Sequence, residues 1–185
     1  MDQKQEQDLI RAAQKGDRNA VGALYDAYAD KIYRYLFFRV DDRATAEDLT
    51  AEVFLNFVEA VRTYEIGETP LIAWLYRVAH ARLVDHYRKQ NRAAKESSLD
   101  DLIVGVEDDT DAQLMSSHRQ EKVRIAMDTL TAEQKQVIIF RFIEGYNLQK
   151  TADLMGKTIG AIKVMQYRAL QSLSRSLNKQ GITSK

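Results

Sequence analysis

Residues in the last quarter of the chain combine the types and the spacing that suit contact with DNA. Two helical segments, 148–155 and 159–174, flank a three-residue turn that begins with Gly156. Glycine permits the left-handed backbone of a tight helix-turn-helix, whose second helix enters the major groove. Basic side chains there can reach phosphates or guanine edges, and small residues let the backbone approach the duplex. The residues expected to face DNA are Thr158, Gly160, Ala161, Lys163, Val164, Tyr167 and Arg168.

The inward face of the same motif is predicted from helical periodicity. Ile162, Met165 and Leu170 are expected to pack inward, and Ala152 to let the two helices approach closely. Any two amphipathic helices around a glycine give this pattern, so the motif alone leaves DNA binding and plain helix packing open. Charge favours DNA, because residues 122–185 hold 11 basic and four acidic side chains.

A second group of polar side chains follows a helical period in the first half of the chain. Asp42 is a candidate cap for a helix whose apolar residues Leu49, Val53, Phe57 and Val61 step by four. Acidic and amide side chains occupy another face of that helix and are expected to point outward: Asp48, Glu52, Asn56 and Glu59. Such a face suits a basic partner, and ordinary solvation explains it as well.

A basic helix is predicted after a break in the apolar period at 63–69. Thr69 and Pro70 supply an N-cap and a proline for its first turn. Trp74 lies on its apolar face and is expected in the core. The rest of this helix is basic, through Arg77, Arg82, Arg88, Lys89 and Arg92.

Catalytic and metal sites are not expected from this sequence. It holds no Cys, and its three histidines, His80, His86 and His118, lack carboxylates at the spacing of a metal site. Neither a nucleophile elbow nor a glycine-rich phosphate loop occurs. We therefore expect no enzymatic activity, no metal and no cofactor.

The elements that must position these residues are predicted to be helices throughout. One proline in 185 residues favours long helices over a turn-rich β protein. We expect an all-α fold of two small helical domains, 1–92 and 122–185, joined by a flexible linker at 93–121. The linker carries two basic and eight acidic side chains with few apolar ones, so it cannot bury much surface.

Local signals predict where several helices begin and end. Gly16 and Asp17 end a first helix and cap a second, whose apolar stripe covers 21–36. Thr131 with Gln134 fits the capping box of a later helix. The apolar run of that helix, ended by Gly145, comprises Val137, Ile138, Ile139 and Phe142.

Targeting signals are not apparent. No apolar run is long enough to cross a membrane, and the N-terminal residues lack the basic and apolar regions of a signal peptide. The sequence therefore predicts a cytoplasmic protein without membrane insertion.

Several segments, in this order, resemble the extracytoplasmic-function (ECF) sigma factors of the sigma-70 family. The segment 42–54, with DLTAEVF at its end, is similar to the polymerase-binding signature of that family. Further similar segments are 24–35, 73–79, 85–89 and 156–169. The resemblance spans nearly all of residues 7–175.

The resemblance implies roles for the first domain as sigma region 2. Its acidic helix would dock on the clamp helices of the largest subunit of core RNA polymerase, through Asp48, Leu49, Glu52, Val53, Phe54 and Asn56. The loop between Arg62 and Thr69 would hold a base flipped out of the minus-ten promoter element, which stacking must stabilise. The residues implied in minus-ten binding are Arg62, Thr63, Tyr64, Arg77, His80, Arg82, His86, Arg88 and Lys89.

The resemblance also implies partners for the rest of the chain. Residues 122–185 would form region 4, which reads the minus-35 element and meets the polymerase flap. The acidic linker would thread toward basic channels of the polymerase, or serve only as a solubilising tether. Promoter DNA and core polymerase in the bacterial cytoplasm are thus the implied partners, and an anti-sigma factor is a further candidate. The alternative function is a helix-turn-helix repressor or activator that acts without binding polymerase.

Overall fold

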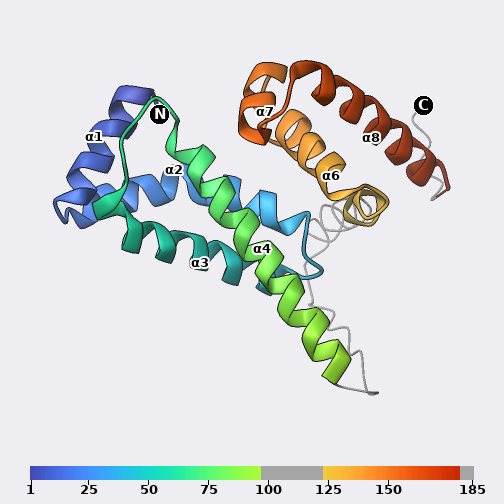
Figure 1. Cartoon of the computed structure of the whole chain (residues 1–185), viewed down its shortest axis with the longest axis horizontal. Helices are drawn as coiled ribbons and strands as arrows, with labels where there is room; N and C mark the ends of the chain where they lie inside the picture. The colour runs from blue at the N-terminus through green and yellow to red at the C-terminus, as the bar shows by residue number, and fades with distance from the viewer. Residues whose placement is uncertain (97–122, 180–185) are drawn as a thin grey trace, which may run out of the picture. The chain divides into compact units, whose positions relative to one another are not determined.

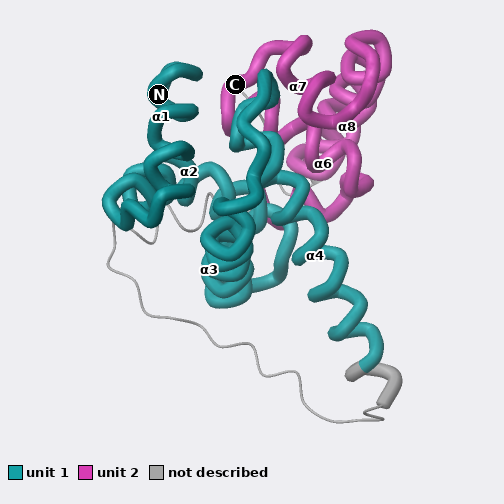
Figure 2. Tube along the Cα trace, turned by 60° about the vertical axis from the view of Figure 1, so that its left-hand side comes forward, with its two compact units in different colours: residues 1–96 teal, residues 97–185 magenta. Residues whose placement is uncertain are grey.

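The computed structural model describes residues 1–96 and 123–179, and these are helical with short connections (Figure 1). No strand occurs within those two ranges, which confirms the predicted all-α class. The chain divides into two compact units, Met1–Glu96 and Ser97–Lys185 (Figure 2). Nearly all of the predicted linker at 93–121 lies outside the described residues.

Unit 1 contains four α-helices and one short 3₁₀ helix. They are α1 (Gln3–Gln14), α2 (Arg18–Phe37), α3 (Arg43–Ala60), η1 (Val61–Thr63) and α4 (Leu71–Glu96). The predicted caps are confirmed, because the Asp17 carboxylate accepts from the amide of Asn19 and the Asp42 carboxylate from that of Thr45, each at 2.8 Å. Helix α4 continues past Arg92, where we expected the first domain to end.

The core of unit 1 lies between α2, α3 and α4. Its largest fully buried side chains are Leu24, Ile32, Tyr35, Leu36, Val53, Phe57, Leu71 and Leu75. Tyr25, within the predicted apolar stripe of α2, is 45% exposed and packs edge-on against Phe54 at 4.7 Å between ring centroids. Trp74 is half-buried and contacts the rings of Phe57 and Tyr64.

The cap at the start of α4 is not the one that we predicted. The helix begins at Leu71, and the amide of Leu71 donates to the Glu6 carboxylate at 2.6 Å. Glu6 belongs to α1 and is only 6% exposed. A carboxylate near the first turn of α4 also interacts favourably with the helix dipole. A residue distant in sequence thus supplies the cap that we expected from Thr69.

Unit 2 holds the helix-turn-helix. Residues 123–127 are helical, followed by α6 (Ala132–Ile138), a π-helical turn η2 (Ile139–Ile143), α7 (Leu148–Met155) and α8 (Ile159–Lys179). The capping box of Thr131 and Gln134 is confirmed. Gly145 has a φ of +69°, a left-handed conformation that suits glycine.

One residue of the predicted apolar run and one predicted inward position in unit 2 lie outside the core. Phe142 is 53% exposed and Phe140 is buried instead, because η2 widens the helix and moves the inward face. Leu170 is 41% exposed, whereas Ala169 is fully buried. Ala169 lies seven residues after the buried Ile162, so the two share a helix face, and Leu170 lies beside it.

Candidate nucleic-acid and polymerase interfaces

Hydrogen bonds at the helix ends fix the two helices of the helix-turn-helix. The Asn147 side chain accepts from the amide of Lys150 at 2.8 Å and caps α7. Gly156 ends α7 in a left-handed conformation, φ +61° and ψ +37°, as predicted from its type. The Thr158 hydroxyl accepts from the amide of Ala161 at 3.2 Å in the first turn of α8. These bonds set where α8 begins.

A small apolar cluster holds α8 against the preceding helices. Val137, Ala152 and Ile162 are buried together, and Leu148, Met155 and Met165 pack around them. The predicted inward positions of Ile162 and Met165 and the close approach at Ala152 are confirmed. Burial of this face leaves the opposite face of α8 to solvent.

The exposed face of α8 carries the residues predicted to meet DNA. Gly160, Lys163, Val164, Tyr167 and Arg168 are exposed, as is Thr158 before the helix, and Ala161 is half-buried. The Tyr167 side chain is the most exposed large apolar one on this face, at 64%, and its hydroxyl accepts from the Gln171 amide at 2.7 Å. This face therefore offers two cations, an aromatic ring and a close backbone approach.

Arg141 is a positioning residue that the sequence analysis missed. Its Nε donates to the Gln166 side-chain oxygen at 3.0 Å, and its Nη1 donates to the Tyr146 carbonyl. Arg141 lies on η2, so these bonds tie the middle of α8 to the turn before α7. In the sequence, the charge of Arg141 does not distinguish it from arginines that are merely exposed to solvent.

The acidic face of α3 is only partly available to a partner. Asp48 and Glu52 are exposed, whereas Leu49, Val53 and Phe54 are 5%, 0% and 7% exposed. The three buried side chains hold α3 in the bundle and can act on a docked protein only by positioning the face. Asn56 is half-buried between α3 and α4. Its amide donates to the Glu52 carbonyl at 2.7 Å and its oxygen accepts from Arg82 at 2.9 Å.

Leu55 is a second residue that the sequence analysis missed. It is 63% exposed, more than any other large apolar side chain that the structure describes in unit 1. It lies seven residues after Asp48, and helical geometry places it between Glu52 and Glu59 on the acidic face. The seven-residue spacing from Asp48 is the signal that could have found it. An apolar residue inside a charged rim is typical of a protein interface.

The loop between η1 and α4 holds the first three residues implied in minus-ten binding. Arg62 and Thr63 are exposed on η1, and Tyr64 is half-buried at the start of the loop. The Tyr64 ring packs edge-on against Trp74 with 5.9 Å between centroids. Burial raises the pKa of Tyr64, and the nearby Glu6 carboxylate acts in the same direction. Tyr64 therefore stays a neutral phenol.

The α4 residues implied in minus-ten binding fall into two groups. Arg77, Arg88 and Lys89 are exposed, and Arg88 pairs with Asp85 at 3.3 Å. Arg82 is half-buried, and its guanidinium donates to the side-chain oxygen of Asn56 on α3, so it links the two helices. The exposed cations form the part of α4 that can reach a phosphate backbone.

The two histidines of α4 contribute differently from these cations. Desolvation lowers the pKa of His80, and the positive charge of Arg39 lowers it further. His80 is therefore neutral at physiological pH. His86 is half-buried, and its ring contacts that of Tyr87 at 5.6 Å between centroids. Neither histidine lies in a group of three potential metal ligands, and no such group occurs among residues 1–96 and 123–179.

Within residues 1–96 and 123–179, no helix combines the length and the apolar character needed to cross a bilayer.

Comparison with known proteins identifies two family matches. Residues 24–93 match "Sigma-70 region 2", and residues 126–175 match "Sigma-70, region 4". The first covers most of α2, all of α3, the loop and most of α4, and the second covers the helix-turn-helix.

Individual proteins show the same similarity. The chain is 36% identical over 172 residues to the ECF RNA polymerase sigma factor BldN of Streptomyces coelicolor, covering 92% of this chain and 65% of BldN. It is 32% identical over 160 residues to the ECF RNA polymerase sigma factor SigX of Bacillus subtilis, covering 83% of this chain and 81% of SigX.

A solved structure has the same fold. It contains the sigma factor RpoE in complex with the anti-sigma factor NepR from Bartonella quintana. The TM-score is 0.63 at 20% identity, and the match covers 85% of this chain and 96% of the solved one. Together with the region 2 and region 4 matches, the identity to SigX shows that this chain belongs to the ECF sigma factors of the sigma-70 family.

Proposed function

We propose that this chain binds core RNA polymerase and directs promoter-specific transcription initiation, and that it leaves the chemistry to the polymerase. The observation that carries the proposal is that region 2 and region 4 occur in one chain, at 24–93 and 126–175. A repressor of the helix-turn-helix class needs only the second of these. We assign this activity to the bacterial cytoplasm, because the proposed partners are a promoter and core polymerase.

The polymerase contact is proposed on the outer face of α3. Asp48, Glu52 and Leu55 are exposed there, and α3 is held by buried residues on its opposite side. The two carboxylates suit the basic clamp helices of the polymerase, and the leucine supplies apolar area at the centre of the contact. We assign the contact with the polymerase flap to unit 2.

The promoter contacts are proposed on two separate surfaces. In unit 1, the loop after η1 and the exposed cations Arg77, Arg88 and Lys89 would hold the minus-ten element. In unit 2, the exposed face of α8 would read the minus-35 element, with Lys163 and Arg168 as the side chains that reach base edges or phosphates. Phosphate contacts of this kind predict that promoter affinity falls steeply with salt.

An anti-sigma factor is the proposed regulator. The solved Bartonella structure contains such a partner. An anti-sigma factor that covers the face of α3 would compete with the polymerase for the same side chains, so the two partners would exclude each other.

The test is reconstitution of the full chain with core polymerase, followed by sequencing of the transcription start sites on genomic DNA. We expect a set of starts that core polymerase alone does not give, with shared minus-35 and minus-ten sequences upstream. The double variant Asp48→Arg and Glu52→Arg should lose both these starts and co-purification with the polymerase. The matched control, Asp26→Arg with Asp30→Arg on exposed positions of α2, should keep both. If the wild-type chain gives no new starts, the proposal fails and the repressor function replaces it.

A further inference from the structure

We propose that helix α1 is a positioning element that holds the backbone of the minus-ten loop, residues 64–70, in the form that receives DNA. This inference rests on the proposed function of that loop. Helix α1 (Gln3–Gln14) lies outside residues 24–93, so the family match assigns it no role.

Side chains of α1 bind main-chain atoms at both ends and in the middle of the loop. Each of three glutamines donates its amide N–H to a different carbonyl, and one carboxylate accepts from the amide that follows the loop. The bonds are Gln14 to Tyr64 (2.7 Å), Gln7 to Gly67 (3.3 Å), Gln3 to Glu68 (3.3 Å) and Glu6 from Leu71 (2.6 Å).

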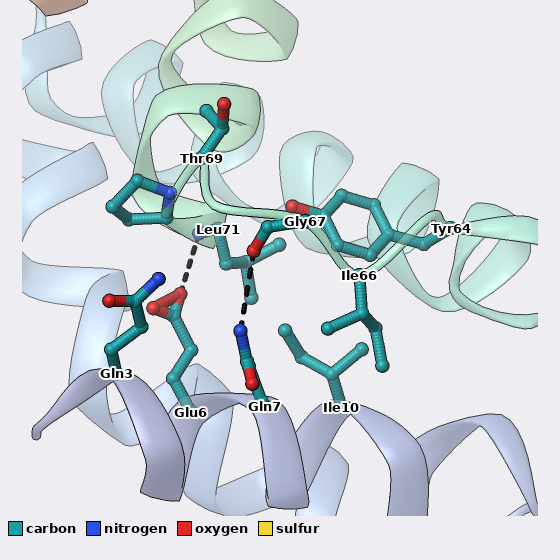
Figure 3. Close-up of a pocket in the computed structure, with 10 residues that line it drawn as sticks. Gln3, Glu6, Gln7, Ile10, Tyr64, Ile66, Gly67, Thr69 and Leu71 are labelled. Carbon is teal, nitrogen blue, oxygen red and sulfur yellow. Dashed lines mark hydrogen bonds between the residues drawn. The ribbon is translucent and has the colours of Figure 1, made fainter.

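Helical geometry explains why these four side chains act together. Residues 3, 6, 7 and 14 recur at spacings of three, four and seven along α1, so they lie on one stripe of the helix. Figure 3 shows Gln3, Glu6 and Gln7 pointing from α1 toward the loop, with the bonds to Gly67 and Leu71 drawn as dashed lines. The loop runs antiparallel to the helix along these bonds, since Gln3, Gln7 and Gln14 bind residues 68, 67 and 64 in turn.

Apolar contacts support the polar ones. Ile10, also on this stripe, is 2% exposed, and Ile66 points from the loop toward it (Figure 3). At the start of the loop Tyr64 packs on Trp74, the single tryptophan of the sequence. Apolar side chains therefore pack against the loop, and hydrogen bonds join its main chain to α1.

Bonds to carbonyls fix the path of the loop without using its side chains. Glu65, Glu68 and Thr69 remain exposed, so they stay available for a DNA strand. A loop that is already ordered loses less conformational entropy when it binds, and its affinity rises accordingly. Direct DNA binding by α1 is the competing explanation. Its two acidic and two basic side chains cancel, which gives no electrostatic attraction for phosphates.

The test compares two double variants of the full chain that each introduce two methionines. Gln7→Met with Gln14→Met keeps side-chain length and removes two of the amide donors. Lys4→Met with Asp8→Met changes exposed positions of α1 and keeps the net charge, so it is the matched control. Circular dichroism establishes that both variants remain folded.

Three measurements compare the glutamine variant with its control. The nuclear magnetic resonance order parameters of the backbone amides at 65–69 should fall toward about 0.6 in the glutamine variant and stay near about 0.85 in the control. Trp74 fluorescence should change in the glutamine variant, because the ring of Tyr64 is no longer held against it. Holoenzyme made with the glutamine variant should bind a single-stranded minus-ten oligonucleotide about tenfold more weakly, while affinity for a minus-35 duplex stays the same.

The outcomes separate this inference from the proposed function. Unchanged order parameters at 65–69 overturn the positioning role, whatever happens to DNA binding. Weaker oligonucleotide binding without lower order parameters also overturns it and points to direct contact by α1. Lower order parameters with unchanged minus-ten affinity overturn the inference as well, because the attachment would then not serve DNA binding. If the wild-type chain selects no promoter at all, the proposed function fails, and the order parameters still decide whether α1 holds the loop.

Discussion

Replacing Ile162 by Ala should strongly destabilise unit 2 and leave the stability of unit 1 unchanged. Ile162 is fully buried where α6, α7 and α8 meet, with Val137 and Ala152 as its buried neighbours. Truncating a buried isoleucine to alanine costs about 2–5 kcal/mol of stability, because less apolar surface is buried on folding and a cavity remains in the core. A domain of roughly 60 residues has about 3–9 kcal/mol of stability, so this loss is a large share of it.

The assay is urea unfolding of the full chain with two probes. Fluorescence of Trp74 follows unit 1 alone, and far-ultraviolet circular dichroism follows both units. With a slope of about 1 kcal/mol per M urea, the unit 2 transition should shift down by about 2 M or more. The Trp74 transition should not move. Affinity for a minus-35 duplex should fall with the folded fraction of unit 2.

Val164→Ala is the matched control on the same helix. Val164 is 50% exposed and two residues away, so its truncation should change stability by less than about 0.5 kcal/mol. The reasoning is refuted if Ile162→Ala costs no more than Val164→Ala. It is also refuted if both probes shift together, since the two units would then unfold as one.

Three further predictions concern the interfaces. Lys163→Ala and Arg168→Ala should each weaken minus-35 binding by about 1–3 kcal/mol if they read bases, whereas Arg175→Ala, farther along α8, should have little effect in the same binding titration. Leu55→Asp should leave the unfolding midpoint unchanged but weaken polymerase binding about tenfold, and pull-down at wild-type strength would contradict the apolar contact. The pKa of His80, followed by nuclear magnetic resonance, should lie below its ordinary value of 6.5. Because the folded pKa is lowered, the neutral ring contributes stability above pH 6.5 that is lost as the pH falls, and His80→Gln should reduce that loss.

Local features of the structure followed from the sequence because their causes are local. Asp17, Asp42 and the Thr131 capping box each satisfy amides within three residues of themselves. Gly156 ends α7 because its left-handed backbone is accessible to glycine. Such interactions need no distant partner, so a short window of sequence contains all that determines them.

Helix faces were predicted less well, because the geometry of a helix decides which residues share its inward side. A π-helical turn displaced Phe142 outward and placed Phe140 in the core. On α8, a regular helix put the small Ala169 inward and left the larger Leu170 exposed. Hydrophobicity alone selects the larger side chain, whereas packing against α6 and α7 selects the one on the correct face.

The sequence by itself determined the all-α class, the helix-turn-helix, the caps and the membership in the sigma family, since all of these rest on periodicity, glycine positions and ordered motifs. Only the tertiary structure decided which of the implied site residues are available. It buried Leu49, Val53 and Phe54, exposed Leu55 and joined Glu6 to Leu71. Contacts between residues far apart in sequence depend on how the helices cross, and helix crossing is fixed by the packing of the whole unit.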